Sequence, residues 1–176
     1  MIKKLIPNQA FLDAIGIADQ FDVGTLMNLI EQYYGERNEL DFKEKLIEPH
    51  KLAKIMLAMA NSGGGTIIFG INDNNEPIGL DESSLSDITE IESKLSTLLP
   101  QALVYSHQII RYPQDEIYKK LSGKIFLIFY IPSQYRNAPF LAIRESNDLK
   151  KNRIYVRRNT SVEEATEKEG TVKNFV

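Results

Sequence analysis

The stretch that decides the fold is residues 59–73, which read Met-Ala-Asn-Ser-Gly-Gly-Gly-Thr-Ile-Ile-Phe-Gly-Ile-Asn-Asp. A run that begins at Pro49 leads into it with apolar residues at helical spacing, so we predict a helix that ends at the glycines. Residues 66–71 are the apolar run of a buried strand, and the polar residues 72–75 favour a tight turn and a hairpin. A helix, a glycine stop, a strand and a turn therefore follow one another at the centre of the fold.

Upstream of this stretch the pattern predicts two short helices and a strand. The helices span residues 8–17 and 24–34 and form an N-terminal arm. Residues 39–43 alternate, with Leu40 and Phe42 on one side and Asp41 and Lys43 on the other, which is typical of a half-buried strand.

Downstream, residues 86–99 have the periodicity of an amphipathic helix. Residues 103–112, 124–131 and 153–158 predict strands, and the second is apolar on both faces, as in a central strand. Thr160 and Glu163 have the spacing of a capping box, which predicts a short final helix. The fold class we expect is α+β, with a mainly antiparallel or mixed sheet backed by helices.

Composition limits the chain to one domain with one core. It has 176 residues, 43% of them hydrophobic, and no cysteine, so disulfides and Cys-ligated zinc are excluded. We expect a helical arm at 1–34, the domain at 35–170 and a loose tail at 171–176. No apolar run approaches the roughly 20 residues that span a bilayer, so we expect a cytoplasmic protein with no membrane partner.

The glycines at 63–65 do not fit a phosphate-binding loop. Such a loop runs from a strand into a helix and presents a positive helix N-terminus, whereas here a helix C-terminus enters the glycines and no lysine follows. We therefore expect no nucleotide cofactor.

Three carboxylates, Glu36, Asp41 and Asp73, come from different segments near strand ends and turns. Hard divalent cations need several such oxygen ligands, and Lys43 lies on the same strand face as Asp41, where its ammonium would stabilise a scissile phosphate. The alternative is purely structural: Glu36 caps a turn, Asp73 belongs to a hairpin turn, and Asp41 pairs with Lys43 on the surface. Both interpretations stay open at this point.

Charge offers no general argument for nucleic-acid binding, because the formal net charge is −3. A local basic segment near the C-terminus is the candidate instead, beside a hydroxyl-rich turn. Its residues are Lys150, Lys151, Arg153, Arg157, Arg158 and Thr160. Ordinary solvated charges would give the same pattern.

Four segments together resemble the Schlafen AlbA-like domain family. They are GERNELDFK at 35–43, MANSGGGTIIFGIND at 59–73, IGL at 78–80 and YVRRNT at 155–160. The resemblance covers roughly residues 33–167, and the combination in this order is far more specific than any single segment.

The resemblance implies an α+β domain that acts on nucleic acid and, as in some Schlafen proteins, a metal-dependent endoribonuclease acting on structured RNA such as tRNA. Carried over by position, the metal and catalytic carboxylates fall on Glu36, Asp41 and Asp73, with Asn72 as the nearest alternative to the third, and Lys43 assists. The implied cofactor is Mg²⁺ or Mn²⁺. Lys151, Arg157 and Arg158 would hold the phosphate backbone, and the two-lobed cores of vertebrate Schlafen proteins suggest a homodimer here.

Two departures from the family pattern keep other functions open. Asp41 replaces the usual glutamate and is shorter by one methylene, and the net charge is acidic. A non-catalytic DNA-binding or regulatory module is one alternative. A protein-interaction domain that uses the N-terminal helices is another.

Overall fold

The computed structural model describes Leu26 and residues 38–165. A four-stranded sheet has the order β1-β2-β4-β3, formed by β1 (Leu40–Lys43), β2 (Gly65–Phe69), β4 (Ile125–Ile131) and β3 (Ser106–Arg111). The β1–β2 pair is parallel, whereas β2–β4 and β3–β4 are antiparallel. The predicted α+β class with a mixed sheet is confirmed, and β4 is central as its apolar pattern indicated.

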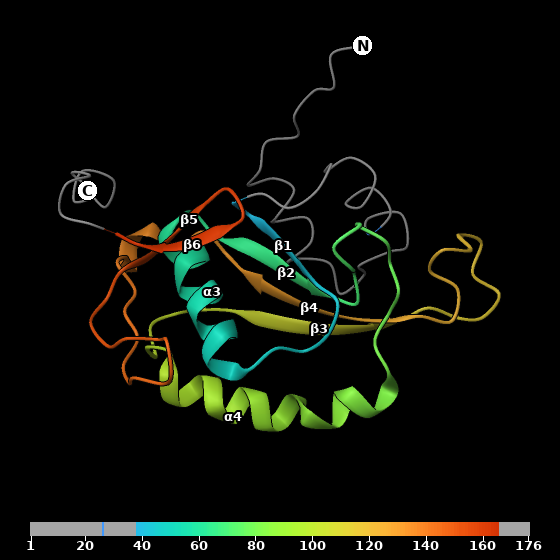
Figure 1. Ribbon diagram of the computed structural model, residues 1–176, viewed down its shortest axis with the longest axis horizontal. Coiled ribbons are helices and arrows are strands. Elements are labelled where there is room, and N and C mark those ends of the chain that lie inside the picture. The colour runs from blue at the N-terminus through green and yellow to red at the C-terminus, as the bar shows by residue number, and fades with distance from the viewer. Residues whose placement is uncertain (1–25, 27–37, 166–176) are drawn as a thin grey trace, which may run out of the picture.

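Helix α3 (Pro49–Asn61) and helix α4 (Ile88–Leu98) pack on one face of the sheet, and a 3₁₀ turn, η1 (Glu82–Asp87), leads into α4. The cluster between them includes Ile67 and Phe69 of β2 and Phe129 of β4. In Figure 1, α4 runs along one side of the sheet while α3 lies between it and the C-terminal hairpin. Both predicted helices are confirmed, because their apolar stripes face this core.

A second cluster covers the opposite face of the sheet. It contains Leu40, Phe42 and Ile68 together with Phe126 and Ile128 of β4. Leu26 is helical and fully buried in the same cluster. Apart from that residue, the predicted N-terminal arm at 1–34 lies outside the described residues, as do Glu36 and the predicted tail.

The glycine stop predicted after α3 is confirmed. Gly63 and Gly64 have φ angles of +100° and +92°, in the left-handed region that side chains disfavour. A Cβ at Gly64 would lie 2.6 Å from the carbonyl oxygen of Ile131, so the backbone could not approach β4 with a larger residue. The turn at 72–75 also forms, although the hairpin beyond it is reduced to one bridge between Ile71 and Pro77.

The C-terminal end differs from the prediction. Instead of a final helix capped by Thr160 and Glu163, strand β6 (Ser161–Glu164) pairs antiparallel with β5 (Tyr155–Arg158). Asn159 has φ +54°, a conformation that asparagine tolerates and that suits a two-residue hairpin turn. The capping-box interpretation was wrong because this turn and the packing of Val162 against the core outweigh a helix signal of only four residues.

Candidate nucleic-acid interface and buried carboxylate

Asp41 lies on the face of β1 that α3 and β5 cover, and its side chain is only 2% exposed. The register pairs Asp41 with Ile67, so it shares the face on which Ile67 packs against α3. The alternation predicted for residues 39–43 is therefore present. The expected half-burial was wrong, because the polar face of the strand is covered as well as the apolar face.

Two cations face the Asp41 carboxylate. The guanidinium of Arg157 on β5 donates to Oδ1 over 3.0 Å, and the ammonium of Lys43 lies 2.6 Å from Oδ2. Asp41 thus does pair with Lys43, as the structural alternative held, but in the interior and with a third partner. The side chain of Arg157 is 1% exposed, whereas that of Lys43 is 29% exposed. A buried ion pair of this kind is costly to break from either side.

Backbone carbonyls complete the surroundings of Arg157. Its Nε donates to the carbonyl of Asn38 over 3.3 Å, and Nη1 also donates to the carbonyl of Thr160 over 3.0 Å. The backbone N–H of Arg157 donates to Oγ of Ser62 over 2.9 Å. One arginine therefore ties the C-terminal hairpin to the start of β1 and to the end of α3.

Asn61, the last residue of α3, connects this helix by hydrogen bonds to two distant segments, a connection that the sequence did not predict. Its amide nitrogen donates to the carbonyls of Phe140 and Tyr155, over 2.9 and 3.0 Å, and its amide oxygen accepts from the N–H of Phe140 over 2.7 Å. Nothing in the local sequence distinguishes such a bridge from an ordinary helix end, because both partners are far along the chain.

The described residues around Asp41 do not form a complete set of ligands for a divalent ion. Asp41 is a buried carboxylate, and the ammonium of Lys43 already lies 2.6 Å from its Oδ2. Asp73, however, is exposed in its turn, and Glu36 lies outside the described residues. Across residues 38–165 no three His, Cys, Asp or Glu side chains come together. One carboxylate already faced by two cations does not fit a divalent ion by itself.

The predicted basic residues separate into two groups. Arg157 points inward to Asp41, whereas Lys151, Arg153, Arg158 and Thr160 are exposed. Arg158 pairs with Glu163 over 3.2 Å and Arg153 with Glu164 over 4.0 Å, and all four of these side chains are close to half exposed or more. Exposed pairs of this type contribute little and are easily exchanged for a phosphate.

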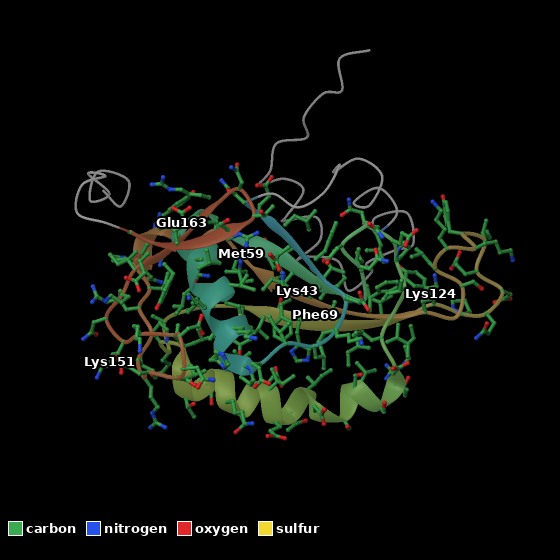
Figure 2. All side chains as sticks on the ribbon, viewed as in Figure 1. Lys43, Met59, Phe69, Lys124, Lys151 and Glu163 are labelled. Atoms are coloured by element: carbon green, nitrogen blue, oxygen red, sulfur yellow. The ribbon has the colours of Figure 1, made fainter. Side chains whose placement is uncertain are left out.

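Further exposed cations, Arg144 and Lys150, lie close in sequence to Lys151 and Arg153. Figure 2 shows Lys151 at one edge of the molecule, at the opposite end from Lys124. Asp148 lies in the same segment, and a hydrogen bond from Lys54 over 2.8 Å holds the pKa of this carboxyl below its ordinary value. The acid nearest the lysines is therefore already neutralised by a cation from α3.

The two histidines take structural positions. His50 is buried and lies 3.2 Å from the side-chain amide of Asn147, and His107 lies 2.8 Å from Glu92. Among the described residues neither joins a group of three His, Cys, Asp or Glu side chains that could hold a metal.

A mixed sheet with both helices on one face and a hairpin anchored to a buried carboxylate define an α+β domain. The chain belongs to the Schlafen AlbA_2 family, because the family described as Schlafen, AlbA_2 matches residues 36–166. Membership of this family supports a nucleic-acid-binding domain. Among the described residues no helix is long and apolar enough to cross a membrane.

Among solved structures, the chain is similar to the crystal structure of the DIP2311 protein from Corynebacterium diphtheriae. The sequence identity is 19% and the TM-score is 0.48, over 81% of this chain. The similar part is 26% of the length of that chain. No curated protein matches the sequence.

Proposed function

We propose that this domain binds nucleic acid through the exposed cations of residues 144–158. The observation that carries the proposal is the composition of this segment, which exposes five cations and two carboxylates in a chain of net charge −3. The cations are Arg144, Lys150, Lys151, Arg153 and Arg158. Contacts from such side chains to phosphates supply affinity without sequence preference, and they are weakened by salt.

The proposal gives Arg157 a positioning role instead of a phosphate contact. Its guanidinium is committed to Asp41 and to two carbonyls, so it holds β5 in place while its neighbours Arg158 and Arg153 remain accessible. Thr160 adds a hydroxyl beside them in the hairpin turn. The cations thus project from a hairpin with a fixed position.

Salt-dependent binding tests this proposal. Fluorescence anisotropy with labelled tRNA and with single-stranded DNA would compare the parent chain with Lys151→Glu/Arg153→Glu and with the control Lys45→Glu, which alters an exposed lysine after β1. We expect the double variant to bind more weakly to both nucleic acids and to show a smaller slope of log affinity against log salt, by about 2 if each residue meets one phosphate. Equal loss in the control, or no loss in the double variant, would contradict it.

Metal-dependent cleavage of structured RNA such as tRNA is a second candidate function. The buried carboxylate of Asp41 with the ammonium of Lys43 beside it, at 2.6 Å from Oδ2, favours it. In this hypothesis Glu36 and Asp73 supply further oxygens to Mg²⁺ or Mn²⁺, and Lys43 stabilises charge on the phosphate. A homodimer would extend the binding groove.

Cleavage is tested by incubating tRNA with the parent chain, in Mn²⁺ or in EDTA, beside the variant Glu36→Gln. Glutamine has nearly the same size as glutamate, so this substitution removes the negative charge and changes little else in the side chain. Products that require Mn²⁺ and disappear in the variant would support the endoribonuclease. Intact tRNA in every lane, with binding retained, leaves the non-catalytic binding domain.

A further inference from the structure

A groove of about 480 Å³ lies where the end of α4, the segment after η2 (Tyr135–Asn137) and the loop before β5 meet. Its walls are mainly apolar, with three polar side chains around them. The residues that matter here are Ala102, Pro139, Ile143, Asn137, Lys151 and Asn152. Apolar walls with a few polar groups, at this size, are typical of small-ligand sites.

The walls of the groove are held in place from several sides. The side chain of Asn61 forms hydrogen bonds with both the N–H and the carbonyl of Phe140. The N–H of Ile143 donates to the carbonyl of Leu98 over 3.0 Å. Leu141 forms a bridge with Ile154, next to β5. The groove is therefore fixed before any ligand arrives, which lowers the entropic cost of binding.

The positive charges in and near the groove favour an anionic ligand. Among the described residues no carboxylate lines it. Lys151 lies in its wall, and Arg144 and Lys150 are exposed nearby in the sequence. Of the two acids in this segment, Asp148 is held by Lys54. A partner that places negative charge beside Lys151 gains Coulomb energy without meeting a repelling carboxylate in the groove.

One large exposed hydrophobic side chain lines the groove. Six large hydrophobic residues are exposed in the described part of the chain, and of these Ile143 belongs to the lining. Tyr135 is 56% exposed and shares the short η2 turn with Asn137. Tyr135 thus lies two residues from a polar residue of the lining, and Ile143 supplies exposed apolar surface within it.

We propose that this groove takes one unpaired base of a single-stranded nucleic acid while Lys151 binds the adjoining phosphate. The proposal rests on the proposed function and deepens it, because it specifies an unstacked strand as the substrate class. The apolar walls receive the face of the base, and the side-chain amides of Asn137 and Asn152 can donate and accept at its edge. An anion that also carries a flat, hydrogen-bonding ring matches all three features of the groove.

Two substitutions separate the base from the phosphate. Ala102→Leu narrows the groove at an exposed position, without adding charge or an aromatic ring. Asn152→Gly removes the amide and keeps the backbone, because Asn152 has φ +60°, which glycine adopts freely. Lys151→Ala removes the phosphate contact, and Lys45→Ala is the matched control for loss of one exposed lysine.

The probes are a short fluorescent oligouridine and the same backbone with every base removed, read by anisotropy at low salt. We expect Ala102→Leu and Asn152→Gly each to weaken oligouridine binding, by about tenfold for the first, and to leave the abasic strand unaffected. Lys151→Ala should weaken both probes. Thermal unfolding of each variant checks that the fold is retained.

Three results would overturn the inference in distinguishable ways. If the parent binds oligouridine and the abasic strand equally, the groove takes no base, although the proposed function stands. If Ala102→Leu leaves oligouridine affinity unchanged, the base lies elsewhere and the groove serves another partner, such as an apolar peptide. If neither probe binds at low salt, the proposed nucleic-acid function fails together with this inference.

Discussion

Replacing Arg157 with methionine removes one half of the buried pair while keeping most of the side-chain volume. Loss of one partner from such a pair typically costs about 3–5 kcal/mol, because the other charge is left uncompensated in the interior. Here Lys43 remains 2.6 Å from Asp41, so the carboxylate keeps one cation and we expect the lower end, about 3 kcal/mol. Asp41→Ala leaves two cations facing each other, so we expect about 4–5 kcal/mol for it.

Urea unfolding followed by circular dichroism measures both values. With a slope of about 2 kcal/mol per molar, a loss of 3 kcal/mol lowers the urea midpoint by about 1.5 M. Arg158→Met is the matched control, because it alters the next residue of β5, whose pair with Glu163 is exposed, and it should cost less than about 1 kcal/mol.

The order of the two variants is the sharpest part of this prediction. If Arg157→Met costs as much as Asp41→Ala or more, Lys43 does not compensate the carboxylate. If Arg157→Met costs no more than Arg158→Met, the buried pair contributes nothing to stability, and the reasoning that anchors the hairpin through it is refuted. The double variant should cost less than the sum of the two single ones, because each removes the same interaction.

Three further predictions concern the other contacts that shape the site. Asn61→Leu loses three buried hydrogen bonds and leaves their backbone partners unsatisfied, so it should cost about 2–4 kcal/mol in urea unfolding, and a smaller loss than about 1 kcal/mol would contradict the bridge. Gly64→Ala should lower the melting temperature by several degrees, by about 2–4 °C for each kcal/mol, because a Cβ there meets the carbonyl of Ile131 in a left-handed conformation. The hydrogen bond from Lys54 lowers the pKa of Asp148 in the folded state. The stability that this pair contributes is therefore present above the unfolded pKa near 3.8 and is lost as the pH falls through the lower folded pKa. The variant Asp148→Asn should flatten the curve of unfolding free energy against pH only in that acidic range.

Hydrophobic periodicity predicted α3 and β2 well, because burial of their apolar side chains determines their secondary structure. The apolar stripe that ends at Met59 packs into a core, and β2 is buried on both faces. Local sequence alone therefore suffices to predict that these residues form a helix and a strand. The same reasoning failed at Thr160, because a four-residue helix signal competes with a hairpin whose stability comes from Asn159 and from packing far along the chain.

The candidate site was predictable only in its residue types. Asp41 and Lys43 share a strand face by simple alternation, and their contact follows from it. That Arg157 turns inward depends on the position of β5 against α3, a tertiary arrangement to which the local sequence gives no clue. A basic run such as residues 150–158 does not reveal which of its cations is buried.

The burial of Arg157 beside Asp41 affects the two candidate functions differently. A carboxylate neutralised by arginine and lysine keeps less attraction for a divalent ion than a free one, so cleavage requires oxygens from outside the described residues or movement of the half-exposed Lys43. Nucleic-acid binding requires neither of these, because the Asp41–Arg157 pair fixes the hairpin from which the phosphate-binding cations project.

The variant Lys43→Met therefore discriminates between cleavage and binding. It removes the cation beside Oδ2 of Asp41 while Arg157 keeps the hairpin in place, so binding at the distant lysines should persist. In a nuclease the same substitution should change Mn²⁺-dependent cleavage, and a protein whose only activity is binding should show no response to the metal with or without Lys43.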